Sequence, residues 1–432
     1  MMSVITDLMS SVSTVPSLDE EVRAWLDHDP GIQARPFDLY RRLQSEAPVY
    51  RAEDRILVTG YPEARSILTA PGTLQGISAK GSRYRTASER LDAERRLELA
   101  QTFGFFEKRL GGSNGEHHTR LRKLAQRAFT PRMVALMEQR IEGIATDMLD
   151  PLVGRDEIEL IGDFAYHLPL IVISEMLDIP TDDRDDLRHW ANDIGHFVGA
   201  DWSSPEMVSE THRSMFALRT YLHDLFAVRR AGGDTTDLLG NLLSASEDGD
   251  EFTEDELVAM VVQFVFAGHE TSTNFIGNFT VLLRGARQDL WNDLLSEPEL
   301  VPSAVEELLR VESPTQYVDK LATEDGELAG CEIHAWDTIS VVVAAANYDP
   351  RVFAEPDTID FRRQPNPHLT FGFGAHHCLG AALARMEAQV VLRTFLRRFP
   401  DMRLSPGPVE WRRNHMLRGP ERLPVSLGPD HG

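Results

Sequence analysis

The chain has 432 residues, of which 42% are hydrophobic and 26% are charged, a globular composition that excludes a disordered or collagen-like chain. Lys and Arg number 44 and Asp and Glu number 68, so the formal net charge of −24 argues against nucleic acid as a partner. Two cysteines exclude a disulfide scaffold, and the lack of a basic leader or a long apolar run predicts no membrane span and a soluble, cytoplasmic protein.

Residues 1–17 are rich in Ser, Thr and Met without periodicity, and we expect a loose arm before a single domain of residues 18–432. Glycines interrupt residues 70–117, where only 87–103 is predicted to be helical. The other early elements that the pattern predicts are a short helix over 36–43, a β-hairpin formed by 49–51 and 56–59, and a helix over 61–68.

The rest of the chain is predominantly helical in its periodicity. Helix dominates and no shift in composition marks a linker, so we expect one mainly α domain with a minor β part. The later predicted elements are a basic amphipathic helix over 118–129, helices over most of 132–230 with breaks at Pro151, Pro180 and 203–205, a strand in the first half of 338–346, a helix over 380–398 and a short β-rich tail.

The segment 371–380 contains three glycines and ends beside Cys378, just before a predicted helix. A helix N-terminus lowers the pKa of a cysteine and favours the thiolate, which is a nucleophile and a metal ligand. Three interpretations of this pattern compete. Cys378 is a buried core residue, or a zinc ligand together with His376 and His377, or an axial ligand of haem iron.

A long apolar helix is predicted after the capping box at 253–256. Ala267 and Thr271 are four residues apart and share one face of this helix. Gly268 and Glu270 between them are costly inside an apolar helix. A purely structural interpretation is a glycine that permits close packing and a glutamate that forms an ion pair.

Two further clusters place charged side chains on single helix faces. Glu307 and Arg310 are three residues apart, a spacing that usually means an exposed ion pair of little energy. His118 and Arg122 are four residues apart and can face the same anion, or they can belong to an exposed basic face.

The spacing Phe371-x-x-Gly374-x-x-x-Cys378-x-Gly380 resembles the haem-binding loop of the cytochrome P450 family, and its continuation to Arg385 resembles the bacterial soluble branch. The resemblance implies that Cys378 is the axial thiolate ligand of haem b. It also implies that Phe371 packs beside this ligand, and that Gly374 and Gly380 let the loop fold under the porphyrin.

The same resemblance implies partners for the haem propionates. His376 in the loop would reach one propionate, and the stretch from His118 to Arg122 resembles the family's H-x-x-L-R segment. Lys320 stands where the family commonly has arginine, and a lysine cannot bind a carboxylate with a two-pronged fork.

The stretch Ala267 to Ser272 is similar to the family's oxygen-activation motif. The resemblance implies that Thr271 hydrogen-bonds dioxygen and that Glu270 helps to relay protons. Glu307, Arg310 and Arg363 would form the family's buried network behind the haem-binding loop, a structural role. The implied fold is the P450 triangular prism, with haem between the long central helix and the helix after the cysteine loop.

These residues together predict a haem-thiolate monooxygenase that uses O2 to hydroxylate or otherwise oxidise a hydrophobic small molecule. Electrons from NAD(P)H would arrive through a separate ferredoxin reductase and ferredoxin, because two cysteines cannot hold an iron–sulfur cluster. The alternatives are a haem-thiolate peroxygenase or isomerase, and a catalytically silent recruitment domain. Ferredoxin docking on this acidic chain needs a basic patch, for which the candidates are Arg120, Lys123, Arg127, Arg132 and Arg385.

The substrate pocket can be outlined only by analogy with the family. Its walls would come from the 70–115 region, the oxygen-activation helix, the segment after Glu307–Arg310 and a turn near the C-terminus. The apolar residues that these regions offer are Phe103, Phe105, Phe106, Val262, Phe266, Ala267, Val318, Met416 and Leu417.

Overall fold

The computed structural model describes residues 16–76, 78–197, 202–232, 237–247 and 249–432. Its α-helices are α1 (Leu18–Leu26), α2 (Pro30–Ala34), α3 (Phe37–Glu46), α4 (Tyr61–Thr69), α5 (Ser82–Glu89), α6 (Ala93–Glu107), α7 (Gly115–Ala128), α8 (Pro131–Leu149), α9 (His167–Met176), α10 (Arg184–Phe197), α11 (Pro205–Gly232), α12 (Leu238–Leu243), α13 (Glu254–Val281), α14 (Gln288–Ser296), α15 (Val301–Val311), α16 (Val343–Ala346) and α17 (Ala381–Arg398).

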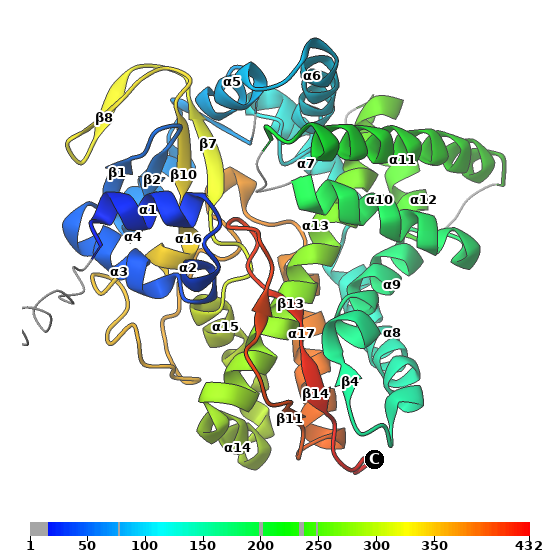
Figure 1. Cartoon of the computed structure of the whole chain (residues 1–432). Coiled ribbons are helices and arrows are strands. Elements are labelled where there is room, and N and C mark those ends of the chain that lie inside the picture. Colours follow the sequence, from blue (N-terminus) through cyan, green and yellow to red (C-terminus); the bar gives the residue numbers. More distant parts are fainter. Residues whose placement is uncertain (1–15, 77, 198–201, 233–236, 248) are drawn as a thin grey trace, which may run out of the picture.

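The strands are short. They are β1 (Val49–Arg51), β2 (Ile56–Val58), β3 (Thr73–Gln75), β4 (Ile158–Glu159), β5 (Ser246–Glu247), β6 (Asp250–Glu251), β7 (Val318–Ala322), β8 (Gly326–Leu328), β9 (Cys331–Ile333), β10 (Thr338–Val341), β11 (Arg403–Leu404), β12 (Glu410–Trp411), β13 (Pro420–Arg422) and β14 (Pro424–Ser426). Strands β1, β2, β7, β8 and β10 lie on one side of the molecule, whereas β4, β11 and β14 lie near the C-terminus (Figure 1). The predicted mainly α fold with a minor β part is confirmed.

Helix α13 runs through the middle of the molecule and contacts α9, α11 and α17 (Figure 1). The predicted capping box starts it: Thr253 Oγ1 accepts from the Glu256 amide at 3.3 Å, and the Thr253 amide donates to the Glu256 carboxylate at 2.8 Å. Its 28 residues span about 42 Å. Most of its side chains are buried, because the helix is surrounded by other helices rather than by solvent.

The main sheet has the strand order β1-β2-β10-β7-β3. The predicted hairpin is its first pair, with Val49 opposite Val58, and β10 then lies parallel to β2. At the other edge Lys320 in β7 pairs in register with Gln75 in β3. This edge faces the helical half of the molecule and brings Lys320 toward the candidate site.

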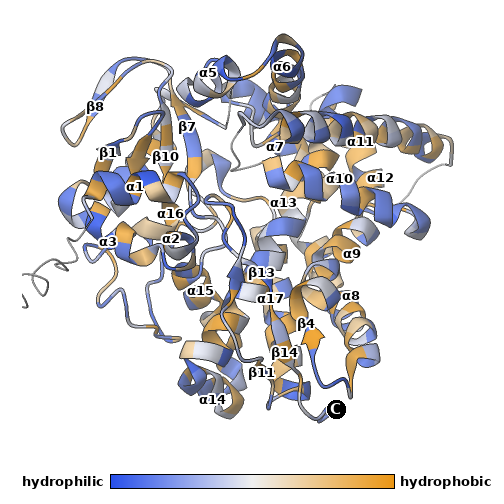
Figure 2. Cartoon of the chain, in the orientation of Figure 1, coloured by the Kyte–Doolittle hydropathy of each residue, from blue (hydrophilic) through white to orange (hydrophobic). Residues whose placement is uncertain are grey.

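The C-terminal segment returns to the helical half. Strands β11 and β14 form a small sheet with β4, and β12 pairs with β13. Strand β13 contacts α13, so the C-terminal hairpin lies along the central helix (Figure 1). Peripheral helices such as α10 alternate hydrophilic and hydrophobic residues, which is the pattern of a helix with one face in the core (Figure 2).

The structure corrects the prediction for residues 70–117. Two helices, α5 and α6, fill much of this region, and the break between them falls inside the predicted helix 87–103. Helix α7 starts at Gly115, three residues before the predicted start at 118. The predicted arm lies outside the described residues except for Pro16 and Ser17, and Ser17 is the N-cap of α1.

Other predicted boundaries are close to those observed. The breaks near Pro151, Pro180 and Pro205 separate α8 to α11, and β10 ends before α16 as expected for the first half of 338–346. Among the helices of the described chain, none combines the length and the hydrophobicity that crossing a membrane requires.

Candidate functional site

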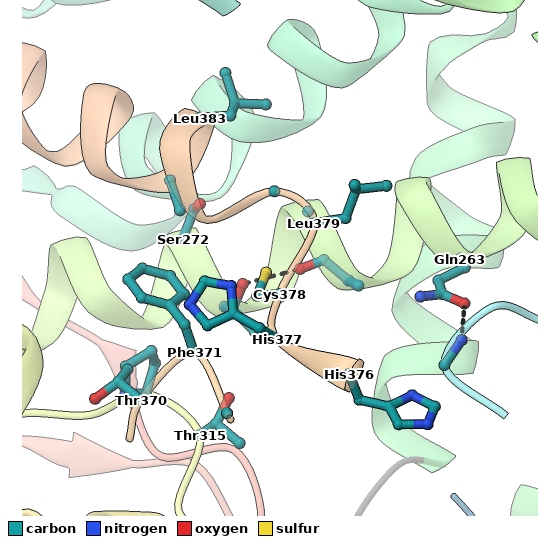
Figure 3. Close-up of a pocket in the computed structure, with 18 of the residues that line it drawn as sticks. Gln263, Ser272, Thr315, Thr370, Phe371, His376, His377, Cys378, Leu379 and Leu383 are labelled. Atoms are coloured by element: carbon teal, nitrogen blue, oxygen red, sulfur yellow. Dashed lines mark hydrogen bonds between the residues drawn. The ribbon is translucent and has the colours of Figure 1, made fainter. Parts of the chain in front are cut away.

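A cavity of about 300 Å³ lies between α13 and the loop that precedes α17. Ala267 and Thr271 line it from α13. Phe371 and Cys378 line it from the loop (Figure 3). Val318 at the start of β7 contributes a third wall. The two strongest sequence motifs, more than a hundred residues apart in the chain, therefore face one enclosed space.

Cys378 lies inside the protein, yet its side chain is accessible because it faces the cavity. Its amide donates to the Phe371 carbonyl at 2.9 Å, and α17 begins three residues later at Ala381. Burial raises the pKa of the Cys378 thiol, and the nearby Gly380 backbone and Arg122 charge oppose this rise only in part. The expectation that the helix N-terminus lowers this pKa is corrected, since desolvation is the larger effect.

The zinc interpretation needs His376 and His377 to turn toward Cys378. His376 instead packs against His118, with ring centroids 4.0 Å apart and the ring planes tilted by 36°, and it points away from the sulfur (Figure 3). Among the residues that the structure describes, no three His, Cys, Asp or Glu side chains are grouped to hold a metal ion. The described side chains around Cys378 therefore do not form a three-ligand metal site.

Four basic side chains gather at one end of the cavity: His118, Arg122, Lys320 and His376. Burial, together with the charges of His118, Lys320 and Arg122, lowers the pKa of His376 to about 3. Burial lowers the pKa of Lys320, which is 3% exposed, to about 8. No acid is among the groups that act on these two side chains.

These side chains fit the carboxylates of an iron porphyrin. His118 Nε2 is buried without a hydrogen-bond partner among the described residues, and Arg122 donates only to the His377 carbonyl, at 2.8 Å. Two propionates would supply the missing acceptors and the missing negative charge. A cysteine sulfur, an apolar cavity and a basic end together make the donor set that haem with a thiolate ligand requires.

Backbone shape explains one of the loop glycines, Gly374, better than the other, Gly380. Gly374 has φ +75°, and a Cβ there would lie 3.0 Å from Thr69 Cγ2 in α4. A side chain at this position would be strained both in its backbone and against its neighbour. At Gly380 a Cβ would lie 4.0 Å from the Cys378 sulfur, an ordinary contact distance, so the need for glycine is weaker there.

The structure brings Glu307, Arg310 and Arg363 together behind this loop. Arg310 forms two hydrogen bonds to the Glu307 carboxylate, at 2.7 and 2.8 Å, and Arg363 donates to it at 3.1 Å. Both Glu307 and Arg310 are fully buried. The pair is therefore not the exposed ion pair that the spacing alone usually means.

Asn347 and Thr370 connect this network to the haem-binding loop. Asn347 Nδ2 donates to Thr370 Oγ1 at 3.0 Å, and Thr370 Oγ1 donates to the Leu309 carbonyl at 2.7 Å. Thr370 directly precedes Phe371. No sequence pattern pointed to Asn347, because its partners are distant in the chain.

Thr271 and Glu270 have different surroundings. Thr271 lines the cavity, and its Oγ1 donates to the Ala267 carbonyl at 2.9 Å. Glu270 is 5% exposed, does not line the cavity, and forms an ion pair with Arg412 after β12. Its Oε2 lies 4.0 Å from His269 Nδ1, and burial lowers the pKa of His269 to about 4. Sequence reasoning missed Arg412.

Glu387 is a cavity-lining carboxyl that the sequence analysis also missed. It lies in α17, is 3% exposed, and accepts a hydrogen bond of 2.6 Å from Ser272 Oγ. Burial raises the pKa of Glu387 to about 7. It lies nine residues after Cys378 and less than two helical turns into α17, and no motif in the sequence marks it.

The predicted pocket residues separate into two groups. Ala267 and Val318 line the cavity. Phe103 and Phe106 instead pack in an aromatic cluster with Phe197, so the structure does not bring them to the cavity. The remaining predicted residues that are not among the lining residues are Phe105, Val262, Phe266, Met416 and Leu417.

The proposed docking patch is smaller than expected. Arg120 forms an ion pair with Glu256 in α13. Arg385 forms two hydrogen bonds to Glu306, at 2.6 and 2.9 Å, and its guanidinium lies 4.3 Å from the Phe371 ring centroid. Both arginines therefore stabilise the surroundings of the site. The exposed members of the patch are Lys123, Arg127 and Arg132.

Comparisons with known proteins agree with this geometry. The family model for Cytochrome P450 matches residues 279–416. The chain is 39% identical to Cytochrome P450 107B1 of Saccharopolyspora erythraea over 94% of this chain and 99% of that protein. It is 35% identical to the cytochrome P450 monooxygenase PikC of Streptomyces venezuelae, with 91% of each chain covered.

Among solved structures, P450BioI in complex with an acyl carrier protein ligated to hexadec-9Z-enoic acid has a TM-score of 0.81 and 30% identity, covering 92% of this chain and 99% of that chain. Similarity of sequence and fold thus extends over nearly the whole chain. By this similarity the chain belongs to the cytochrome P450 family and is a P450 monooxygenase.

Proposed function

We propose that this P450 inserts one oxygen atom of O2 into a hydrophobic small molecule and reduces the other atom to water. One observation carries the proposal: Cys378 and Thr271 face the same apolar cavity from opposite elements. Haem bound there supplies the redox chemistry that activates O2. Cys378 would hold its iron, and His118, Arg122, Lys320 and His376 would hold its propionates.

The chain's own residues would manage protons and water. Thr271 holds a hydroxyl proton at the cavity wall, now donated to the Ala267 carbonyl. Glu270 lies one residue earlier, and its ion pair with Arg412 keeps a carboxylate close to that wall but outside the cavity. Apolar lining residues such as Phe264 and Leu383 limit the entry of bulk water.

Electrons would pass from NAD(P)H through a ferredoxin reductase to a ferredoxin. Helix α7 supports this arrangement, since Lys123 and Arg127 are exposed on it while Arg122 reaches the loop beside Cys378. A basic patch of this kind can attract an acidic ferredoxin although the whole chain carries a net charge of −24. The substrate is either free or attached to a carrier protein. The attached form is the one that the name of the P450BioI complex describes for that relative.

The experiment that tests the proposal is the absorption spectrum of the purified, dithionite-reduced protein with carbon monoxide. We expect a strongly red-shifted Soret band, because a cysteine thiolate donates electron density to the iron. Cys378→Ala should abolish this shift, whereas Cys331→Ala, which removes the other cysteine, should retain it.

Other outcomes separate the alternatives. A haem band without the red shift would contradict the assignment of Cys378, and no haem band after haem is supplied would favour a recruitment domain. A peroxygenase or isomerase would keep the red-shifted band but would turn over its substrate without ferredoxin and NAD(P)H.

A further inference from the structure

Gln263 is a polar residue in the most apolar stretch of α13. The residues on either side of it, 257–262 and 264–267, are all hydrophobic, yet Gln263 lines the same cavity as Cys378 and Thr271. A carboxamide that is withdrawn from water costs stability unless its oxygen and its two N–H groups find hydrogen-bond partners. Neither the haem binding nor the proton chemistry proposed above uses this side chain.

The oxygen of the carboxamide is held by the backbone. The Gly111 amide donates to Gln263 Oε1 at 2.8 Å, from the segment between α6 and α7. A backbone N–H only donates, so the oxygen must face it and the nitrogen is left for another partner. A Cβ at residue 111 would lie 3.2 Å from Gln263 Nε2, so a residue larger than glycine would crowd the carboxamide.

The nitrogen of the carboxamide has no partner in the described part of the chain. Among these residues none accepts a hydrogen bond from Gln263 Nε2, so its two N–H groups are free to donate. The nitrogen turns from the Gly111 bond toward the side of the pocket on which Cys378 lies (Figure 3). Because Oε1 is anchored, Gln263 presents to the cavity a donor whose orientation is fixed.

The position of this donor along α13 suits recognition rather than reaction. Gln263, Ala267 and Thr271 follow one another at intervals of four residues, so they lie along one face of the helix, and all three line the cavity. With a rise of about 1.5 Å per residue, the backbone of Gln263 lies about 12 Å from that of Thr271. The donor is therefore two turns away from the hydroxyl proposed to serve oxygen chemistry.

Two other polar side chains of the lining have different surroundings. Ser272 donates to the Glu387 carboxyl at 2.6 Å. Gln75 in β3 lies directly opposite Lys320 in β7, and side chains opposite each other in neighbouring strands share one face of the sheet. Gln75 therefore belongs with the basic cluster at the propionate end, whereas Gln263 is a donor available to the contents of the cavity.

We propose that Gln263 determines substrate specificity by donating a hydrogen bond from Nε2 to an oxygen atom of the substrate. The substrate class is then an otherwise hydrophobic molecule with a ketone, ester or hydroxyl oxygen roughly 10 Å from the carbon that is oxidised. A pure hydrocarbon would leave the N–H groups unpaired and would bind less tightly. This inference rests on the proposed function, because it takes the haem cavity as the substrate's site.

The test compares ligands that differ in one oxygen atom. Methyl decyl ketone and cyclododecanone are each paired with the hydrocarbon in which a methylidene group replaces the carbonyl oxygen. Titration of the Soret band of the haem-loaded full chain at pH 8 gives the dissociation constants. Each ketone should bind about fivefold more tightly than its hydrocarbon, which is the gain expected from one neutral hydrogen bond.

Three variants separate the donor from its structural role. Gln263→Glu keeps an oxygen for the Gly111 amide, but a carboxylate has no N–H to donate, so the preference for ketones should disappear or reverse. Gln263→Met should lose the preference as well. Gln101→Glu makes the same change in charge at an exposed position of α6 that does not line the cavity, and should keep the preference.

Equal affinities within both pairs, or failure of both ketones to bind, would overturn the proposal. So would an unchanged preference in Gln263→Glu, the result expected if Gln263 only holds Gly111. Weaker haem retention in Gln263→Glu with the ketone preference intact would assign Nε2 to a haem propionate instead. The carbon monoxide spectrum, recorded first, tests the proposed function separately. A red-shifted band without a ketone preference would keep that function and remove Gln263 from substrate recognition.

Discussion

The hydroxyl of Thr271 lies at the boundary between α13 and the cavity. It donates a hydrogen bond to the Ala267 carbonyl one turn earlier in the helix. This bond is local, so the hydroxyl can turn and donate to another acceptor instead. Helix propensity does not explain a threonine there, since threonine is less favourable inside a helix than alanine or leucine. Its presence is better explained by the proton chemistry proposed for the cavity.

Thr271→Ala should leave the fold and haem content intact, because a net loss of about 1 kcal/mol is expected for one such hydrogen bond. Product formed per NAD(P)H consumed should fall severalfold while hydrogen peroxide rises. Thr271→Ser keeps the hydroxyl and should restore most of the coupling. Full coupling in the alanine variant would remove Thr271 from the proton relay.

The raised pKa of Glu387 predicts how the stability of the folded protein changes with pH. Its pKa is about 7 in the folded protein against an ordinary value of 4.5, so the folded state favours the protonated form. The stability that Glu387 contributes is full below pH 4.5 and is lost as the pH rises through about 7. This loss amounts to about 3 kcal/mol at most.

Glu387→Gln should therefore be more stable than the wild type at pH 8, and the difference should shrink toward pH 5. Urea unfolding at both pH values measures it, with the exposed Glu410→Gln as the control. Parallel stability curves for wild type and Glu387→Gln would contradict the raised pKa.

Among the elements, the long segment between α16 and α17 is held by contacts that are remote in sequence. Glu307 in α15 receives hydrogen bonds from Arg310, Arg363 and Asn366, and Asn366 Nδ2 donates at 3.1 Å. The carboxylate therefore ties the helix to the long irregular segment that leads into the cysteine loop. Without it, two guanidinium groups would face each other in a buried space.

Glu307→Gln should destabilise the protein by about 3–5 kcal/mol, as is typical when one partner of a buried ion pair is removed. Haem should also be lost more readily, because the loop that carries Cys378 rests on this network. Urea unfolding and haem transfer to apomyoglobin measure the two effects. The exposed Glu299→Gln provides the control, and a change as small as the control's would show that the network is dispensable.

Elements that are defined by neighbouring residues could be predicted from the sequence. The capping box at Thr253, the β1–β2 hairpin and the cysteine loop depend on neighbouring residues, and all three were recognisable. Helix α5 was missed because its eight residues are mostly polar and bury only Arg83 and Ala87, so no apolar periodicity marks it.

Contacts between residues distant in the chain could not be predicted, because no local pattern marks them. Arg412 meets Glu270, and Glu387 meets Ser272, only after α13, α17 and the C-terminal hairpin have packed together. Phe103 and Phe106 have the composition of pocket residues, yet their neighbours Phe197 and Trp202 enclose them. Composition predicts that an aromatic residue is buried, but not which surface buries it.

On the scale of the whole molecule, charge is distributed unevenly. A chain of net charge −24 repels an acidic partner at long range, and a local basic surface must overcome this repulsion at the docking face. Arg120 and Arg385 are already engaged by Glu256 and Glu306, so the attraction is left mainly to exposed side chains of α7 and its C-terminal end.

The double variant Lys123→Glu/Arg127→Glu should slow reduction by ferredoxin about tenfold or more at low ionic strength, and the difference should decrease in salt. Stopped-flow reduction under carbon monoxide measures the rate. Arg155→Glu/Arg403→Glu makes the same change in net charge elsewhere. If both variants slow equally, total charge rather than a local patch controls docking.

The small sheet that joins β4 to β14 has a consequence for biosynthesis. Ile158 and Glu159 find their strand partners only in Val425 and Pro424, close to the end of the chain. Residues 160–423 must therefore be synthesised before this sheet can close, whereas helices such as α8 and α9 emerge much earlier. During synthesis the edge of β4 therefore stays unpaired. A chain truncated before residue 424 would keep that edge unpaired permanently.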